Sequence, residues 1–96
     1  MDVRMKERLT PNAMREYFVY NRRTGELRWK DDGTLAGSIH PRIHYRVVSI
    51  GTTQYYAHRI AWAMVHGEWP DGQVRHRNRD RSDNSWGNLY IIRNKA

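Results

Sequence analysis

The middle of the sequence constrains the fold most, because it places two short β-prone segments directly before a short helical one. Residues 44–50 and residues 54–57 are β-prone, and residues 51–53 between them, Gly-Thr-Thr, are typical of a hairpin connection. Residues 58–66 carry apolar side chains at helical spacing, and Gly67 predicts the end of this helix. A chain that combines antiparallel strands with helices in this way is expected to belong to the α+β class.

The segments on either side predict further short elements. Thr10 followed by Pro11 predicts the start of a helix, because threonine caps helices and proline suits their first position. The remaining expectations are a helix over residues 11–18, a turn at 21–25, strands at 26–30, 74–77 and 89–92, and a loop over 31–41.

The chain has 96 residues, which predicts one small domain over residues 1–96. Within it we distinguish an N-terminal helix and strand region, 1–57, from a C-terminal region, 58–96. The absence of cysteine excludes a disulfide framework and a thiolate zinc site. Neither a membrane span nor a signal peptide is recognisable, so we expect a cytoplasmic protein with no membrane partner. The aromatic residues expected in the core are Trp29, Trp62, Trp69 and Trp86.

The charge of the chain favours a nucleic-acid partner. Lysine and arginine together number 17 against 10 acidic residues, for a net charge of +7, and most of the basic residues are arginine. Arginine can bind phosphate through two parallel hydrogen bonds. The excess lies in residues 1–30 and 71–96, whereas residues 31–70 are balanced. A basic surface without a ligand is the alternative interpretation.

Arginine also recurs at every second position near the C-terminus, at Arg75, Arg77, Arg79 and Arg81. In an extended segment these four side chains would share one face, which could follow a phosphate backbone. The alternative is that the segment curls as a loop and the side chains spread into solvent.

Several segments together resemble a known family. These are residues 45–50 (YRVVSI), 57–62 (AHRIAW), 67–70 (GEWP) and 76–89, in that order, preceded by residues 24–29 (TGELRW). They resemble the phage-type HNH endonucleases, the His-Me finger or ββα-metal class, over about residues 10–92. The resemblance implies an N-terminal helix and a β-hairpin plus helix, packed on a truncated ββα-metal motif. It also implies a phage or mobile-element origin, and hence a host-cell cytoplasm.

The resemblance implies roles for individual residues. His76 would be the general base that activates water, and Asn84 and Asn88 would be the asparagines that hold the loop and orient the histidine. His58 is part of the family pattern, and we expect it to pack or cap rather than to act in catalysis. A divalent ion would be held by an acidic residue just before the motif histidine and by a later histidine or asparagine.

This sequence departs from that pattern at the positions that are expected to bind the metal ion. Arg75 stands where the acidic ligand is expected, and arginine offers no oxygen to a hard ion such as Mg²⁺. Its charge about 4 Å from a divalent ion would cost on the order of 8 kcal/mol at an effective dielectric constant near 20. The last ligand is expected beyond the final residue, Ala96, and Asn94 is too close to the last strand to replace it. Asp80 or Asp83 could substitute for Arg75, although a structural role is expected for Asp83.

The sequence therefore predicts a catalytically degenerate HNH-like protein rather than an efficient enzyme. We expect no metal cofactor, with Mg²⁺ or Mn²⁺ needed only if the chain is active. The expected partner is nucleic acid, DNA above all, or a nucleic-acid-processing complex, and one role would be inhibition of host defence. The alternatives are an active metal-dependent DNA-nicking endonuclease and a protein-binding module with a basic face. The expected contacts with nucleic acid are Arg75, Arg77, Arg79, Arg81, Arg46, Arg22 and Arg23.

Overall fold

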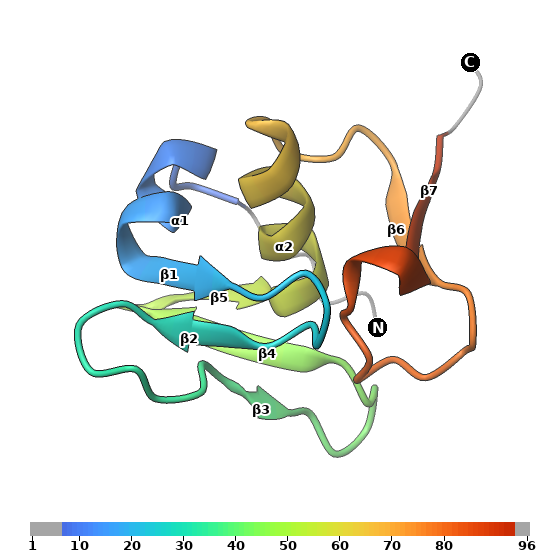
Figure 1. The fold of residues 1–96 in the computed structure, drawn as a ribbon, viewed down its shortest axis with the longest axis horizontal. Coiled ribbons are helices and arrows are strands. Elements are labelled where there is room, and N and C mark those ends of the chain that lie inside the picture. Colours follow the sequence, from blue (N-terminus) through green and yellow to red (C-terminus); the bar gives the residue numbers. More distant parts are fainter. Residues whose placement is uncertain (1–6, 94–96) are drawn as a thin grey trace.

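The computed structural model describes residues 7–93 and has a mixed α+β architecture, which confirms the predicted class (Figure 1). Small antiparallel sheets pair β1 with β2, β3 with β4 and β5, and β6 with β7. The elements, in chain order, are α1 (Pro11–Tyr17), β1 (Phe18–Tyr20), β2 (Leu27–Trp29), β3 (Ser38–Ile39), β4 (Arg46–Ile50), β5 (Thr53–Tyr56), α2 (Ala57–His66), β6 (Gln73–His76), the 3₁₀ turn η1 (Trp86–Asn88) and β7 (Leu89–Ile92).

The N-terminal region begins as its capping residues predict. The Oγ1 atom of Thr10 accepts a hydrogen bond from the backbone N–H of Ala13 at 3.2 Å, and Pro11 opens α1. The helix ends one residue earlier than expected, because Phe18 already begins β1, which pairs with β2. The predicted turn is present, and its Gly25 has a φ of 80°.

The predicted hairpin and helix form the centre of the molecule. Strands β4 and β5 pair through the expected turn, and α2 ends at Gly67, whose φ of 80° suits glycine. The loop expected over residues 31–41 contains β3, an addition that the sequence did not predict. Both residues of β3 are exposed, so its position follows from pairing with β4 rather than from hydrophobic patterning.

Helices α1 and α2 pack against each other on one side of the strands (Figure 1). The largest buried side chains lie between these layers and come from both regions of the chain: Met14, Phe18, Leu27, Val48, Tyr55 and Ile60. A smaller cluster of Ala61, Val74 and Leu89 attaches the β6–β7 hairpin to α2. The four tryptophans expected in the core are half-buried at the margins of these clusters.

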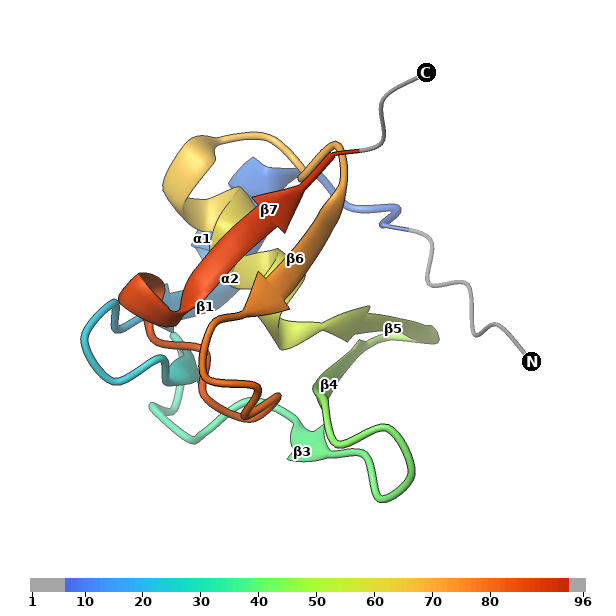
Figure 2. The same ribbon diagram turned by 90° about the vertical axis from the view of Figure 1, so that its right-hand side faces the viewer.

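The β6–β7 hairpin lies beside α2, and a long loop joins its strands (Figure 2). Val74 of β6 is paired with Ile91, and His76 with Leu89. Strand β6 ends at His76, and Arg79 has a φ of 65°, so residues 77–82 curl instead of continuing the strand. The prediction of an extended arginine ladder is therefore wrong, and the segment curls as the alternative expected, although the side chains do not all spread into solvent. Among the described residues, no helix is long and apolar enough to cross a membrane.

Candidate functional site

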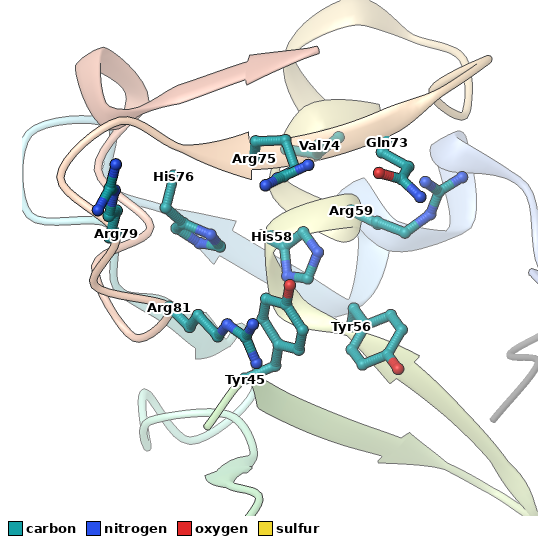
Figure 3. A pocket seen from close by; sticks show the side chains of 10 residues that line it. All are labelled: Tyr45, Tyr56, His58, Arg59, Gln73, Val74, Arg75, His76, Arg79 and Arg81. Atoms are coloured by element: carbon teal, nitrogen blue, oxygen red, sulfur yellow. The ribbon is translucent and has the colours of Figure 1, made fainter. Parts of the chain in front are cut away.

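A pocket of about 620 Å³ opens where β6 and its following loop face the start of α2 and the two ends of the β4–β5 hairpin (Figure 3). It brings together residues from both regions of the chain. The residues that line it are Tyr45, Tyr56, His58, Arg59, Gln73, Val74, Arg75, His76, Arg79 and Arg81.

His76 lies at the end of β6 and is held in one orientation. Its Nε2 atom lies 2.8 Å from Oδ1 of Asn84, and the two side chains are only 8% and 3% exposed. Because an amide oxygen can only accept, Nε2 carries the proton in this arrangement, and a neutral ring then keeps the lone pair on Nδ1. Asn84 therefore fixes the tautomer of the candidate general base.

Asn84 is itself supported by the N-terminal hairpin. The hydroxyl group of Tyr20, at the end of β1, donates a hydrogen bond of 2.6 Å to the backbone carbonyl of Asn84. Burial raises the pKa of Tyr20 to about 12, so its hydroxyl stays protonated and remains a donor. The loop that orients His76 is thus attached to a strand far away in the sequence.

Asn88 closes the same loop but does not line the pocket. Its Nδ2 group donates to Oδ1 of Asn78 at 2.9 Å and to the carbonyl of Asp83 at 2.8 Å, and its Oδ1 accepts from the N–H of Asn78 at 3.0 Å. A single amide side chain thus ties the two ends of the loop together. The structure brings His76 and Asn84 into contact, whereas the side chain of Asn88 bonds to Asn78 and Asp83.

The two aspartates considered as substitute ligands are engaged within the loop. Oδ1 of Asp80 accepts from the hydroxyl and N–H groups of Ser82, and Oδ1 of Asp83 accepts from those of Ser85. These hydrogen bonds lower the pKa of both carboxyl groups. Neither aspartate lines the pocket.

Curling of the loop gathers part of the arginine series around His76. Arg75, Arg79 and Arg81 line the pocket, whereas the guanidinium carbon of Arg77 lies 5.2 Å from the ring centre of Tyr90. Arg81 is held by a 2.9 Å hydrogen bond from Nη1 to the carbonyl of Ile43 and lies over the ring of Tyr45. Three of the four arginines therefore converge on one pocket rather than along one strand face.

The other expected contacts with nucleic acid lie outside the pocket. Arg46 donates from Nη1 to the carbonyl of Gly37 at 2.8 Å and so holds the segment that leads into β3. Arg22 and Arg23 are exposed in the turn after β1. None of these three residues is among those that line the pocket.

His58 is a pocket residue whose position the sequence interpretation undervalued. It is 4% exposed, and its ring centre lies 5.1 Å from that of His76 and 4.8 Å from that of Tyr45. Its Nδ1 atom is buried and has no hydrogen-bond partner among the residues that the structure describes. Burial, followed by the nearby His76 and Arg59, lowers the pKa of His58 to about 3, so the ring is neutral near pH 7. It packs in the pocket wall and makes no capping hydrogen bond at the start of α2.

Tyr45, Tyr56, Arg59 and Gln73 also line the pocket without having been predicted as site residues. Arg59 connects separate segments of the chain, because it forms an ion pair with Glu7 and donates hydrogen bonds to the carbonyls of Pro70 and Gly72. One feature of the sequence could have indicated two of the pocket residues. Tyr56 and His58 lie within two positions of each other at the junction of the predicted hairpin and helix. Only the packing of β6 against α2 brings this junction next to His76.

The residues around His76 do not fit a divalent metal ion. Mg²⁺ and Mn²⁺ prefer oxygen ligands, carboxylates above all, and the pocket lining contains four arginines and no carboxylate. Within residues 7–93, no three histidine, cysteine, aspartate or glutamate side chains gather as a metal site. The expectations about Asn94 and about a later ligand fall outside the described residues.

The chain was also compared with known proteins. Residues 55–95 match the family model described as HNH endonuclease. No curated protein and no solved structure matches the chain. The matched region includes α2, β6, the curled loop and β7, and with them His58, His76, Asn84 and Asn88. This match supports the family resemblance that the sequence motifs indicated.

Proposed function

Since residues 55–95 match the HNH endonuclease family, we propose that this chain binds nucleic acid through the pocket around His76 and does not cut it efficiently. The observation that carries the proposal is the convergence of Arg75, Arg79 and Arg81 on the pocket that contains the candidate general base. Guanidinium groups are donors that match phosphate oxygens, and the chain carries a net charge of +7. DNA is the expected ligand, free or within a nucleic-acid-processing complex.

Loss of efficient cutting follows from the same residues. In metal-assisted hydrolysis the ion lowers the pKa of a bound water and stabilises charge on the reacting oxygens. Guanidinium groups can neutralise phosphate, but their pKa lies far above neutrality, so they cannot activate water as a base. Their positive charges also oppose the entry of a divalent cation. The pocket therefore favours a bound phosphate over a bound metal.

A wider role belongs to the same proposal. A small phage or mobile-element protein that occupies nucleic acid without cutting it could inhibit a host-defence complex that needs the same substrate. The support for this role is the family resemblance together with the basic pocket.

Plasmid nicking tests the proposal directly. We expect no relaxation of supercoiled DNA by the wild-type protein over a titration of Mg²⁺ or Mn²⁺, and the same result for His76→Ala. Arg75→Asp removes one phosphate contact and adds a carboxylate, so we expect weaker DNA binding from this variant. Wild-type nicking that disappears in His76→Ala would overturn the proposal.

A metal-dependent nicking endonuclease is the second candidate, and one observation favours it. The hydrogen bond between His76 and Asn84 leaves Nδ1 as the proton acceptor of a neutral ring, which is the state that a general base requires. If this candidate is correct, nicking requires added metal and is lost in His76→Ala, while Arg79→Gln mainly weakens substrate binding.

A further inference from the structure

We propose that the pocket accepts one unpaired nucleotide of a single-stranded nucleic acid, with its phosphate near Arg79 and Arg81 and its base against Tyr56. This inference deepens the proposed function and rests on it. It starts from the uneven distribution of side chains in Figure 3, where His76 and Arg79 lie at one end and Tyr56 and Gln73 at the other.

The end of the pocket near Tyr56 has no arginine that is free to bind phosphate. Arg59 lies there, but both terminal nitrogens and Nε are engaged by Glu7 and by the carbonyls of Pro70 and Gly72. The opposite end has Arg79, whose side chain makes no hydrogen bond to residues 7–93, and Arg81, whose side chain makes one. Arg75 lies between the two ends, so the arginines available to a phosphate group lie in the middle of the pocket and at the end near Arg79.

Aromatic rings form the wall between these ends. Tyr45 packs against Tyr56 and His58, with ring centres 5.3 Å and 4.8 Å away, and Tyr56 stacks on His58 at 5.2 Å. The ring of Tyr45 is already covered by the guanidinium group of Arg81 at 4.8 Å. Tyr56 is only partly buried, and no cation from the described part of the chain lies over its ring, which makes it the ring on which a base would stack.

Gln73 adds a polar group that can recognise a base edge. It lies at the start of β6, is exposed, and has an uncharged amide that both donates and accepts hydrogen bonds. Glutamine side chains pair with base edges in nucleic-acid complexes, whereas phosphate binding relies mainly on cations. An aromatic ring beside an amide thus complements a base, while the arginines complement the phosphate.

This division of the pocket favours an unpaired strand over a duplex. In a duplex the bases stack on one another, and their faces become accessible only when a nucleotide is flipped out at a cost in free energy. A pocket that recognised duplex phosphates alone would need the arginines but neither Tyr56 nor Gln73. Stacking on one aromatic side chain commonly changes single-strand affinity by about tenfold or more, which sets the size of the expected effect.

The test compares a labelled single-stranded DNA, the RNA of the same sequence and the matching DNA duplex by fluorescence anisotropy. Tyr56→Leu should weaken binding of the single strand about tenfold and leave duplex binding within about twofold. Tyr56→Phe keeps the ring and should bind like the wild type. Arg79→Gln should weaken all ligands, because every strand carries phosphate. The expected loss in Tyr56→Leu with either single strand supports the inference, and the strand that the wild type binds more tightly identifies the sugar.

The outcomes separate this inference from the proposed function. If Tyr56→Leu leaves single-strand affinity unchanged, or lowers single-strand and duplex affinity equally, the inference is wrong while salt-sensitive binding still supports the proposed function. If no strand binds, both are wrong. Photo-crosslinking of the wild-type protein to an oligonucleotide that contains 5-iodouracil gives a second readout that needs no variant. We expect the crosslink at Tyr56, and a crosslink found only outside the pocket would overturn the inference.

Discussion

Nε2 of His76 and Oδ1 of Asn84 lie 2.8 Å apart, both residues are buried, and His76 lines a pocket that it shares with arginine side chains. His76 lies in the region that matches the HNH endonuclease family model, and the neighbouring Arg75 is unsuited to hold a metal. The family resemblance therefore rests in part on His76, and the proposed loss of cutting rests on Arg75.

Asn84→Ala should destabilise the protein by about 1–3 kcal/mol, because it leaves Nε2 of the buried His76 without its partner. Chemical denaturation of wild type and variant measures this difference in the free energy of unfolding. Gln54→Ala, an exposed position on β5, is the control and should change stability by less than about 0.5 kcal/mol. Equal effects of the two substitutions would contradict the structural role of Asn84.

Gly25→Ala should destabilise the protein far more than Gly33→Ala. Both glycines have a positive φ, of 80° and 71°. A Cβ atom at Gly25 would lie 2.3 Å from the backbone nitrogen of Ser85, whereas one at Gly33 would meet nothing within 4 Å. We expect about 1 kcal/mol for Gly33→Ala from backbone conformation, and at least about 2 kcal/mol more for Gly25→Ala from the added clash. Thermal unfolding compares the two, and similar melting temperatures would show that the turn does not press against the loop of Asn84.

Tyr20→Phe should lower stability by about 1 kcal/mol and disturb His76. The substitution removes the hydroxyl that donates to the carbonyl of Asn84 at 2.6 Å. Tyr17→Phe is the matched control, since Tyr17 is 43% exposed and its hydroxyl makes no hydrogen bond within residues 7–93. NMR of the His76 ring should show a change in Tyr20→Phe and none in Tyr17→Phe. An unchanged His76 spectrum in both variants would contradict the proposed support.

Stability should fall as the pH is lowered from 6.5 to 5, partly because of His58. The folded-state pKa of this histidine is lowered to about 3. Between pH 6.5 and 5, His58 therefore becomes protonated in the unfolded chain but stays neutral in the folded protein. Near pH 7 both states are neutral, and this effect disappears. We expect His58 to contribute about 2 kcal/mol of destabilisation at pH 5. In His58→Leu the slope of stability against pH should be shallower over this range, and an unchanged slope would show that His58 is protonated in the folded state.

Local signals in the sequence predicted much of the fold. Thr10 and Pro11 located the first helix, and the hairpin, α2 and Gly67 lie where their patterns predict. Strands β1 and β3 were missed because pairing with β2 and β4, rather than their own short sequences, determines them. Aromatic residues of the pocket were missed for a similar reason, since hairpin register and helix packing bring Tyr45 and His58 to His76.

The prediction of an extended arginine ladder was wrong, and the residues of the same segment explain why. A period of two has meaning only in an extended strand, and residues 78–85 are rich in turn-forming side chains. Oδ1 of Asn78 accepts from the N–H of Asp80 at 2.9 Å, and Oδ1 of Asp80 accepts from the N–H of Ser82 at 3.0 Å. These successive side-chain turns curl the loop and bring Arg79 and Arg81 towards His76.

The most direct test of the account is the affinity of the wild-type protein for a labelled oligonucleotide in EDTA and in Mg²⁺ or Mn²⁺, with ionic strength matched. If arginine side chains bind the phosphate without a metal, the dissociation constant in EDTA equals that with metal within about twofold, and affinity falls steeply with added salt. The oligonucleotide should also remain intact throughout. Binding that requires the divalent ion, or cleavage that appears when it is added, would contradict the account.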